Sequence, residues 1–150
     1  MGNELTLDNQ VCFALYSASR AVTAVYRPIL EPLGLTYPQY LVLLVLWEND
    51  PVTVKRLGEE LMLDSGTLSP LLKRMIAAGL VTKERSSADE RSVLVRLTPA
   101  GRDLRDRAAG VPAQVAAATG LTPARLRELR TTLREIAGAA QATAAGLPPA

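Results

Sequence analysis

The sequence predicts a mainly α-helical protein that carries one small β-hairpin. In most of the 150 residues, apolar side chains recur every three or four positions, which is the helical period. Residues 80–97 depart from it, because two short runs with a period of two flank a polar stretch, as in a hairpin. Hydrophobic residues make up 48% of the chain, so we expect a globular protein with a buried core.

The N-terminal part contains two predicted helices. The first begins near Asp8, a good N-terminal cap, and carries an apolar stripe that Pro28 and residues 32–34 bring to an end. The second begins at Thr36, which serves as its cap, and a proline follows in the first turn. Its body, residues 40–47, is apolar on every side, which indicates full burial.

Two shorter helices follow, the first of them capped by Thr53. Gly79 ends the second, but its start is ambiguous. Ser69 followed by Pro70 is a cap with a first-position proline, so local rules place the start at Ser69. A start near Ser65 leaves Pro70 inside the helix, where the proline removes a backbone hydrogen bond. At this point the sequence leaves both starts open.

The C-terminal part contains further helices with a repeated start signal. Thr98-Pro99 and Thr122-Pro123 each combine a cap with a first-position proline. Residues 110–112 are expected to kink or break the chain between them, and residues 146–150 to form a disordered tail. We see no linker between domains, so we treat residues 1–150 as one domain.

Several classes of function are excluded by composition. The chain has one cysteine and no histidine, so it lacks a disulfide framework, the usual zinc sites and any cysteine–histidine nucleophile pair. We therefore expect no metal and no cofactor. The longest strongly apolar run, Tyr40–Trp47, is far shorter than the ~20 residues needed to cross a bilayer. The N-terminus lacks a signal-peptide pattern, so we expect a cytoplasmic protein that does not enter membranes.

Positive charge is concentrated in the middle of the chain. Residues 65–96 carry six Lys and Arg against three acidic residues, whereas residues 1–50 carry two Arg against five acidic residues. A basic segment in a nearly neutral protein indicates either a localised site for a polyanion or a solvated face. Charge alone does not choose between these two interpretations.

The order of the elements favours the polyanion. Two short helices, a tight turn and a hairpin, set in a frame of other helices, are typical of a winged helix-turn-helix, whose second helix enters the major groove of DNA. The DNA-binding lobe would span about residues 51–98. The candidate contact residues are Ser65, Thr67, Ser69, Lys73, Arg74, Arg85, Asp89 and Arg91.

The candidates have different expected roles. The three hydroxyls start the recognition helix and can donate to phosphates or base edges, and the two cations follow one turn later. Arg91, at the hairpin tip, is placed to enter a minor groove, while Asp89 holds either Arg91 or Arg85. The alternative is that Ser65 and Thr67 only cap the helix and Arg91 is only a solvated turn residue.

Five strings in the chain match a known family in register from about residue 8 to residue 101. They are Asn9–Phe13, Leu35–Leu41, Leu63–Leu68, Leu71–Met75 and Asp89–Val93. The chain resembles the multiple-antibiotic-resistance regulator (MarR) family, and within it the organic-hydroperoxide-resistance repressors. The resemblance implies a homodimer that binds a palindromic operator, with dimerisation helices in about residues 1–36 and 99–145. It also implies that the recognition helix begins near Ser65.

The resemblance further gives Cys12 a role as a redox sensor. A thiolate attacks the O–O bond of a hydroperoxide, and a free thiol is mostly protonated at neutral pH. Cys12 is expected in the first helical turn, where the helix dipole favours an anion, although Asp8 opposes this. In the family, two tyrosine hydroxyls, here those of Tyr26 and Tyr37, hydrogen-bond the sulfur across the subunit interface. The apolar neighbours Val11 and Phe13, together with Leu15 and Trp47, suit an organic hydroperoxide.

The expected function is therefore a repressor that binds DNA while Cys12 is reduced and leaves it when an organic hydroperoxide oxidises Cys12. With no second cysteine, the sulfenic acid must pair with a small cellular thiol, form a sulfenamide or over-oxidise. One alternative is a MarR-type repressor that a small anionic or phenolic ligand releases, with Cys12 as a small buried hydrophobe. A thiol peroxidase and a helical protein adaptor are weaker alternatives. Tyr26 and Tyr37 can be read as core aromatics, and Tyr16 and Tyr40 more readily so.

Overall fold

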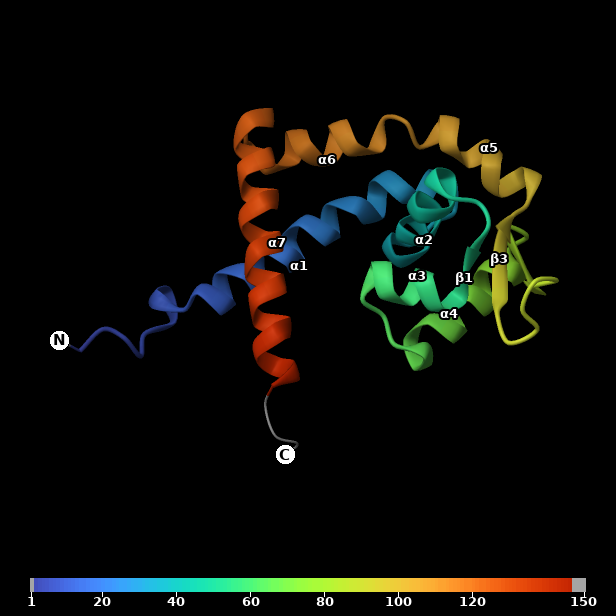
Figure 1. Cartoon of the computed structure of the whole chain (residues 1–150). Coiled ribbons are helices and arrows are strands. Elements are labelled where there is room, and N and C mark those ends of the chain that lie inside the picture. Colours follow the sequence, from blue (N-terminus) through green and yellow to red (C-terminus); the bar gives the residue numbers. More distant parts are fainter. Residues whose placement is uncertain (1, 147–150) are drawn as a thin grey trace. The chain divides into compact units, whose positions relative to one another are not determined.

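The computed structural model describes residues 2–146, which divide into two units at Val111 (Figure 1). The predicted tail falls mostly on residues 147–150, which lie outside the described residues. The elements in chain order are α1 (Val11–Leu30), α2 (Tyr37–Glu48), β1 (Val52–Thr53), α3 (Val54–Leu61), α4 (Ser65–Ala77), β2 (Val81–Arg85), β3 (Val93–Leu97), α5 (Pro99–Arg107), α6 (Val111–Thr119) and α7 (Pro123–Ala145). One-turn 3-10 helices, Leu7–Asn9 and Glu31–Leu33, flank α1. The predicted fold class, mainly helical with a small β wing, is confirmed.

Helix α1 differs from its prediction at both ends. It begins at Val11, and its N-cap is Gln10, which makes no side-chain cap bond, so the predicted Asp8 cap is wrong. Asp8 lies in the preceding 3-10 helix, while the Gln10 side chain donates to the carbonyls of Glu4 and Thr6. At the other end the helix runs through Pro28 but ends at Leu30, and the chain turns at residues 32–34 as predicted.

Helix α2 follows its sequence signals closely. The Thr36 hydroxyl accepts from the Gln39 backbone N–H, and the Gln39 side chain accepts from the Thr36 N–H, which together form a capping box. Leu43 and Leu46 are almost completely buried, and so is Tyr40 at 3% exposure, as expected for a helix that is apolar on every side. Tyr16, by contrast, is 58% exposed, so the prediction that it is a core aromatic is wrong.

The hairpin is part of a three-stranded antiparallel sheet with the order β1-β3-β2. The predicted strands β2 and β3 pair from Val81 opposite Leu97 to Arg85 opposite Val93. Strand β1, which the sequence did not predict, pairs Val52 with Val95. Two residues are too few to show a period of two. This strand therefore depends on its pairing with β3, which the sequence pattern of residues 52 and 53 does not reveal.

Helix α4 settles the ambiguity at Pro70. It starts at Ser65, and Pro70 lies inside it, so the start that local rules favour at Ser69 is wrong. Asp64 caps the helix by accepting a 2.8 Å hydrogen bond from the Thr67 N–H. Leu68, in the turn before the proline, is 1% exposed. This cap and this burial outweigh the bond that Pro70 loses.

Helix α5 lies very close to Leu80, the residue that precedes β2. A Cβ at Gly101 would collide with the carbonyl oxygen of Leu80. The Gly101 carbonyl accepts a 2.9 Å hydrogen bond from the Trp47 indole, and Thr98 donates its N–H to Leu80 and its hydroxyl to Gly79. This junction joins α2, α5 and the chain that leaves α4, and only glycine fits at its centre.

The second unit contains most of α6 and all of α7. Thr122 caps α7 as predicted, by accepting from the Arg125 N–H. The stripe formed by Leu129, Leu133 and Ile136 is between 37% and 43% exposed. Among the described residues no single helix combines the length and apolar character needed to cross a membrane, and α1 and α2 reach that threshold only as a pair bent by 72°.

We expect Gly101→Ala to lower the free energy of unfolding by about 1 to 3 kcal/mol, because the Leu80 carbonyl must move to admit the methyl group. Urea denaturation at fixed protein concentration measures this. Gly138→Ala in α7 is the matched control, since no atom lies within 4 Å of a Cβ there. It should raise stability by about 0.4 to 1 kcal/mol, and equal effects of the two changes would contradict the packing argument.

Candidate functional site

The exposed face of α4 carries the hydroxyls and cations expected of a recognition helix. Ser65, Ser69 and Lys73 follow one another at four-residue intervals, and Thr67 and Arg74 lie beside them; all five are exposed. The opposite face is buried through Leu68, Leu71, Leu72 and Met75. Burial of that face fixes which residues of α4 solvent can reach.

The start of α4 carries a negative charge, that of Asp64, which the sequence analysis did not single out. Asp64 is the N-cap, whereas Ser65 is the first helical residue and not the cap. Hydrogen bonds from the backbone and side chain of Thr67 hold the pKa of the Asp64 carboxyl below its usual value. The cap is therefore ionised at neutral pH, beside the exposed hydroxyls.

The hairpin tip is an ordered turn. Asp89 accepts a 3.0 Å hydrogen bond from the backbone N–H of Arg91, and its second oxygen accepts from the Ser92 hydroxyl at 3.5 Å. Arg85 donates to the carbonyl of Glu90 at 3.0 Å. Asp89 thus holds the backbone of Arg91 and neither guanidinium, and the exposed Arg91 side chain makes no recorded ion pair among the described residues.

Along the strands, Arg96 and Glu84 form the ion pair of the wing, at 2.8 Å. The Glu84 carboxylate raises the pKa of the Arg96 guanidinium further. Both side chains are more than 40% exposed, so this pair adds little stability. The ion pair neutralises one positive charge of the wing. Among the described residues, three cations of the wing remain without an acidic partner: Lys83, Arg91 and Arg85, of which Arg85 donates to a backbone carbonyl.

Cys12 is the second residue of α1 and is exposed. Its predicted place in the first helical turn is confirmed, and that turn contains no acidic residue. Around it, Leu7, Val11 and Phe13 are between 43% and 66% exposed. The thiol is therefore exposed at the N-terminal end of α1, in a segment that also exposes apolar side chains.

Tyr26 and Tyr37 form an aromatic pair with ring centroids 4.5 Å apart. Tyr40 adjoins Tyr26 at 5.8 Å, and Trp47 meets Tyr40 edge-on at 6.3 Å. Burial, the largest cause, raises the pKa of Tyr26, Tyr37 and Tyr40, and mutual repulsion adds to it for Tyr26 and Tyr40. Their hydroxyls stay protonated at neutral pH and can donate hydrogen bonds.

Cys12 and this aromatic cluster (Tyr26, Tyr37, Tyr40 and Trp47) are far apart within one chain. Tyr26 lies fourteen residues after Cys12 on the same continuous helix, which corresponds to about 21 Å. Trp47, expected beside Cys12, instead belongs to the cluster. The chain therefore does not bring the three predicted sensing residues together by itself.

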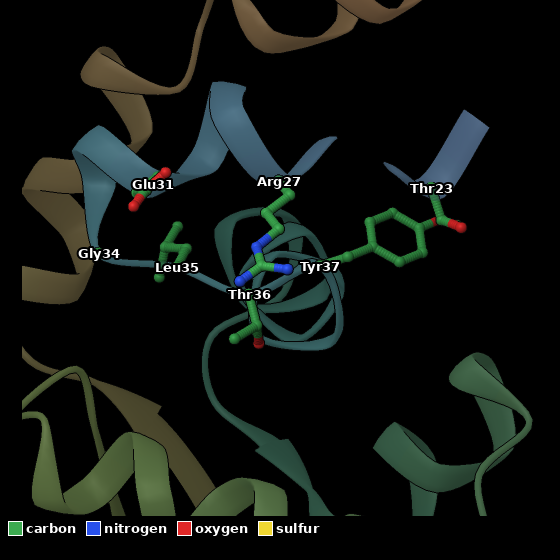
Figure 2. A pocket seen from close by; sticks show the side chains of 7 residues that line it. All are labelled: Thr23, Arg27, Glu31, Gly34, Leu35, Thr36 and Tyr37. Atoms are coloured by element: carbon green, nitrogen blue, oxygen red, sulfur yellow. The ribbon is translucent and has the colours of Figure 1, made fainter. Parts of the chain in front are cut away.

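A cavity of about 500 Å³ adjoins the cluster, between the end of α1 and the start of α2. Figure 2 shows the Arg27 guanidinium pointing into it over Thr36, with Tyr37 along one wall and Leu35 along another. Among the described residues, the Arg27 side chain makes none of the observed hydrogen bonds or ion pairs. The sequence analysis did not single out Arg27, and only the position of its side chain relative to Tyr37 reveals it.

A short helix, a turn, an exposed second helix and an ordered basic wing define a winged helix-turn-helix transcriptional regulator. The comparisons with known proteins agree. The model of the family "Transcriptional regulator SarA/Rot" matches residues 24–108. The chain is 47% identical over 131 residues to the organic hydroperoxide resistance transcriptional regulator of Bacillus subtilis, covering 87% of this chain and 89% of that protein. The chain belongs to the MarR family of DNA-binding transcriptional regulators, a family that includes the organic hydroperoxide resistance regulator. Its relatives are transcriptional regulators and not enzymes.

Two solved structures are informative about related proteins. AbfR, a protein of Staphylococcus epidermidis, in its reduced form bound to DNA is 33% identical, with a TM-score of 0.71 and coverage of 90% of this chain and 97% of that one. AbfR is also known in an overoxidised form bound to DNA and in a disulfide form. BpsR of Bordetella bronchiseptica, whose DNA binding is regulated by 6-hydroxynicotinic acid, is 27% identical, with a TM-score of 0.80 and coverage of 88% and 96%.

The lowered pKa of Asp64 predicts a pH-dependent contribution of its cap. The cap stabilises the fold fully at a pH well above the pKa of an Asp in the unfolded chain, about 3.9. Its contribution is lost as the pH falls through the lower pKa that Asp64 has in the folded protein. The difference in urea midpoint between wild type and Asp64→Ala should be constant from about pH 5 to 7 and shrink below about pH 4. Asp64→Asn, whose amide accepts a hydrogen bond without titrating, should differ from Asp64→Ala by a constant amount. A wild-type advantage that persists unchanged into strong acid would refute the cap's role.

Proposed function

We propose that this protein is a redox-sensing repressor, whose reduced dimer binds a palindromic operator and whose oxidation at Cys12 by an organic hydroperoxide releases the DNA. One observation carries the proposal. A thiol at one end of α1 and a pair of tyrosine donors at the other end are about 21 Å apart, so they can meet only between two chains. The relationship to the Bacillus subtilis regulator and to AbfR in several oxidation states supports it.

DNA binding is assigned to α4 and the wing. Ser65, Thr67 and Ser69 would contact phosphates or base edges in the major groove, and Lys73 and Arg74 would contact phosphates. The turn held by Asp89 leaves the Arg91 side chain free to enter the minor groove. Arg85, anchored to the Glu90 carbonyl, adds charge beside it. Affinity should fall with salt, since phosphate contacts release counterions.

Dimerisation would use the apolar surfaces left exposed in one chain. The N-terminal part of α1 presents Leu7, Val11 and Phe13, and α7 presents Leu129, Leu133 and Ile136. These surfaces lie in the two regions assigned to dimerisation, about residues 1–36 and 99–145. Pairing them with a second chain removes them from water and allows Cys12 of one chain to approach Tyr26 and Tyr37 of the other.

We call the place where Cys12 of one chain would meet Tyr26 and Tyr37 of the other the sensing joint. There, the two tyrosine hydroxyls donate hydrogen bonds to the sulfur and stabilise its anionic form. The thiolate attacks the outer oxygen of the hydroperoxide, an S–O bond forms, the O–O bond breaks, and the alkoxide leaves and takes a proton from water. Cys12 is thereby oxidised to a sulfenic acid and the hydroperoxide is reduced to an alcohol. A low-molecular-weight thiol then displaces hydroxide as water to form a mixed disulfide. Because overoxidised AbfR occurs bound to DNA, we assign release in this protein to the mixed disulfide.

A route from the sensing joint to the recognition helix is available within the chain. Tyr26 contacts Tyr40, Tyr40 contacts Trp47, and the Trp47 indole is bonded to Gly101. Gly101 in turn lies against Leu80, just beyond α4. An adduct that displaces the tyrosines would therefore shift the base of α4 through packed groups, and not through a flexible loop.

The second candidate is a repressor released by a small anionic or phenolic ligand. The cavity beside Arg27 favours it, because a free guanidinium, a phenol and an apolar wall suit an aromatic acid. BpsR responds to 6-hydroxynicotinic acid. In that case Cys12 is incidental and hydroperoxide leaves the complex intact.

The redox function is tested by a gel shift on a palindromic duplex selected with the reduced protein. Wild type should release the duplex on treatment with cumene hydroperoxide together with a small thiol, whereas Cys12→Ser should bind as tightly and stay bound, because it has no oxidisable sulfur. Ser17→Ala on the same helix is the matched control and should behave like wild type. Release of Cys12→Ser by the hydroperoxide would end the sensing proposal, and release by an aromatic acid alone would establish the second candidate.

Cross-linking tests whether Cys12 meets the tyrosines of a partner. Two differently tagged chains are mixed, one with the native Cys12 and one with Cys12→Ser and Tyr37→Cys, and treated with a short bis-maleimide. We expect a mixed covalent dimer, since position 37 of one chain should lie beside Cys12 of the other. A chain with Cys12→Ser and Lys55→Cys is the control and should not cross-link. A monomer in sedimentation, or no mixed dimer, would rule out the joint.

A further inference from the structure

The tip of helix α4 carries a negative charge on the surface assigned to DNA. Residues 64–67 are all exposed there, and the lowered pKa of the Asp64 carboxyl keeps it ionised at neutral pH. Asp64 takes part in none of the ion pairs observed among residues 2–146. An acid that no cation neutralises therefore lies on the surface that must approach a polyanion, where its charge opposes binding.

The capping role of Asp64 does not require this charge. Its Oδ1 accepts the Thr67 N–H at 2.8 Å, and serine or asparagine makes this bond about equally well at an N-cap. The side-chain caps of α2, α3, α5 and α7 are threonines, which are uncharged. The charge at the cap of the recognition helix therefore points to a role beyond capping.

The carboxylate also limits what the tip of α4 can contact on DNA. A helix N-terminus ordinarily attracts phosphate through its free N–H groups and its dipole. Here the N–H groups of Gly66 and Thr67 both bond to Asp64, and the carboxylate repels phosphate. The tip is therefore unsuited to the DNA backbone. A base edge that donates a hydrogen bond is the partner in the major groove that suits it.

Asp64 has room for one such bond. A carboxylate can accept about four hydrogen bonds, and the Thr67 hydroxyl and the two N–H groups use three of these positions. In the major groove cytosine presents an amine donor and has no acceptor of its own there, which matches a carboxylate. We propose that Asp64 determines operator specificity, because it accepts a hydrogen bond from a cytosine amine in each half-site and keeps phosphate away from the tip of α4. This inference rests on the proposed assignment of α4 to the major groove and names what its first turn reads.

The base contact is tested on the palindromic duplex selected with the reduced protein. Each C·G pair is replaced by G·C in both half-sites, one position at a time, and affinity is measured by fluorescence anisotropy at fixed salt. At one position we expect the swap to weaken binding by wild type about ten-fold and by Asp64→Asn less than about two-fold. The asparagine variant keeps the cap, because its oxygen still accepts the Thr67 N–H, but its amide nitrogen donates where the carboxylate accepted.

Glu59→Gln is the matched control, since it removes an exposed acid from α3 in the same lobe. It should show the wild-type loss at every position. If every swap weakens Asp64→Asn as much as wild type, or if Glu59→Gln also loses the preference for cytosine, the base contact is overturned.

The exclusion of phosphate is tested on a random duplex of the same length. Asp64→Asn should bind it about three-fold more tightly than wild type at low salt, because a negative charge beside the backbone is gone. Unchanged or weaker binding would overturn this part of the inference. Lys73→Gln separates the role of Asp64 from the assignment of α4, because loss of a phosphate contact should weaken binding to both duplexes.

The two possible failures are distinguishable. If Lys73→Gln binds both duplexes like wild type, the assignment of α4 to DNA fails, and the role of Asp64 fails with it. If Lys73→Gln weakens both complexes while Asp64→Asn keeps the wild-type ratio of operator to random-duplex affinity, only the role of Asp64 fails.

Discussion

The close approach of Gly101 to Leu80 is the constraint on which the rest of this winged helix depends. Here the backbone of α5 meets the backbone before β2 directly, because Gly101 faces the Leu80 carbonyl, and α2 joins them through the Trp47 indole N–H, which the Gly101 carbonyl accepts. Thr98 adds hydrogen bonds from its N–H and hydroxyl to the same turn. Directional bonds at contact distance fix α5, α2 and the exit of α4 relative to one another more tightly than apolar packing would.

This rigidity gives a regulator two useful properties. The recognition helix has one defined orientation, since its buried face and its C-terminal exit are both fixed. The aromatic cluster is also in direct contact with this junction, because the Trp47 ring meets Tyr40 and the Trp47 indole N–H is bonded to Gly101. The groups proposed to contact DNA and a second chain lie outside this core, on exposed surfaces of α4, the wing, α1 and α7.

Sequence reasoning succeeded where a local interaction decides the outcome and failed where a distant one does. The caps at Thr36, Thr53, Thr98 and Thr122 were predicted correctly, because each is a hydrogen bond within three residues. Local rules left the start of α4 open and favoured Ser69, whereas the start near Ser65 that the resemblance implies is the observed one, with Leu68 buried in the turn before Pro70. Strand β1 and the exposure of Tyr16 were missed for the same reason, since both depend on which segments lie opposite.

By itself the sequence determined the class of fold and the order of the elements, and its resemblance to a family singled out Cys12 as the candidate sensor. Periodicity and capping are short-range properties, so neighbouring residues reveal both, whereas the role of Cys12 is what the family resemblance implies. Only the tertiary structure decided that Asp64 caps the recognition helix, that Tyr26 stacks on Tyr37, and that Arg27 points into a cavity beside them. It also showed that Cys12 lies far from those tyrosines along one rigid helix, a separation that follows from the unbroken course of α1 through Pro28. These relations join residues that are distant in sequence or depend on helix continuity, so no local pattern could encode them.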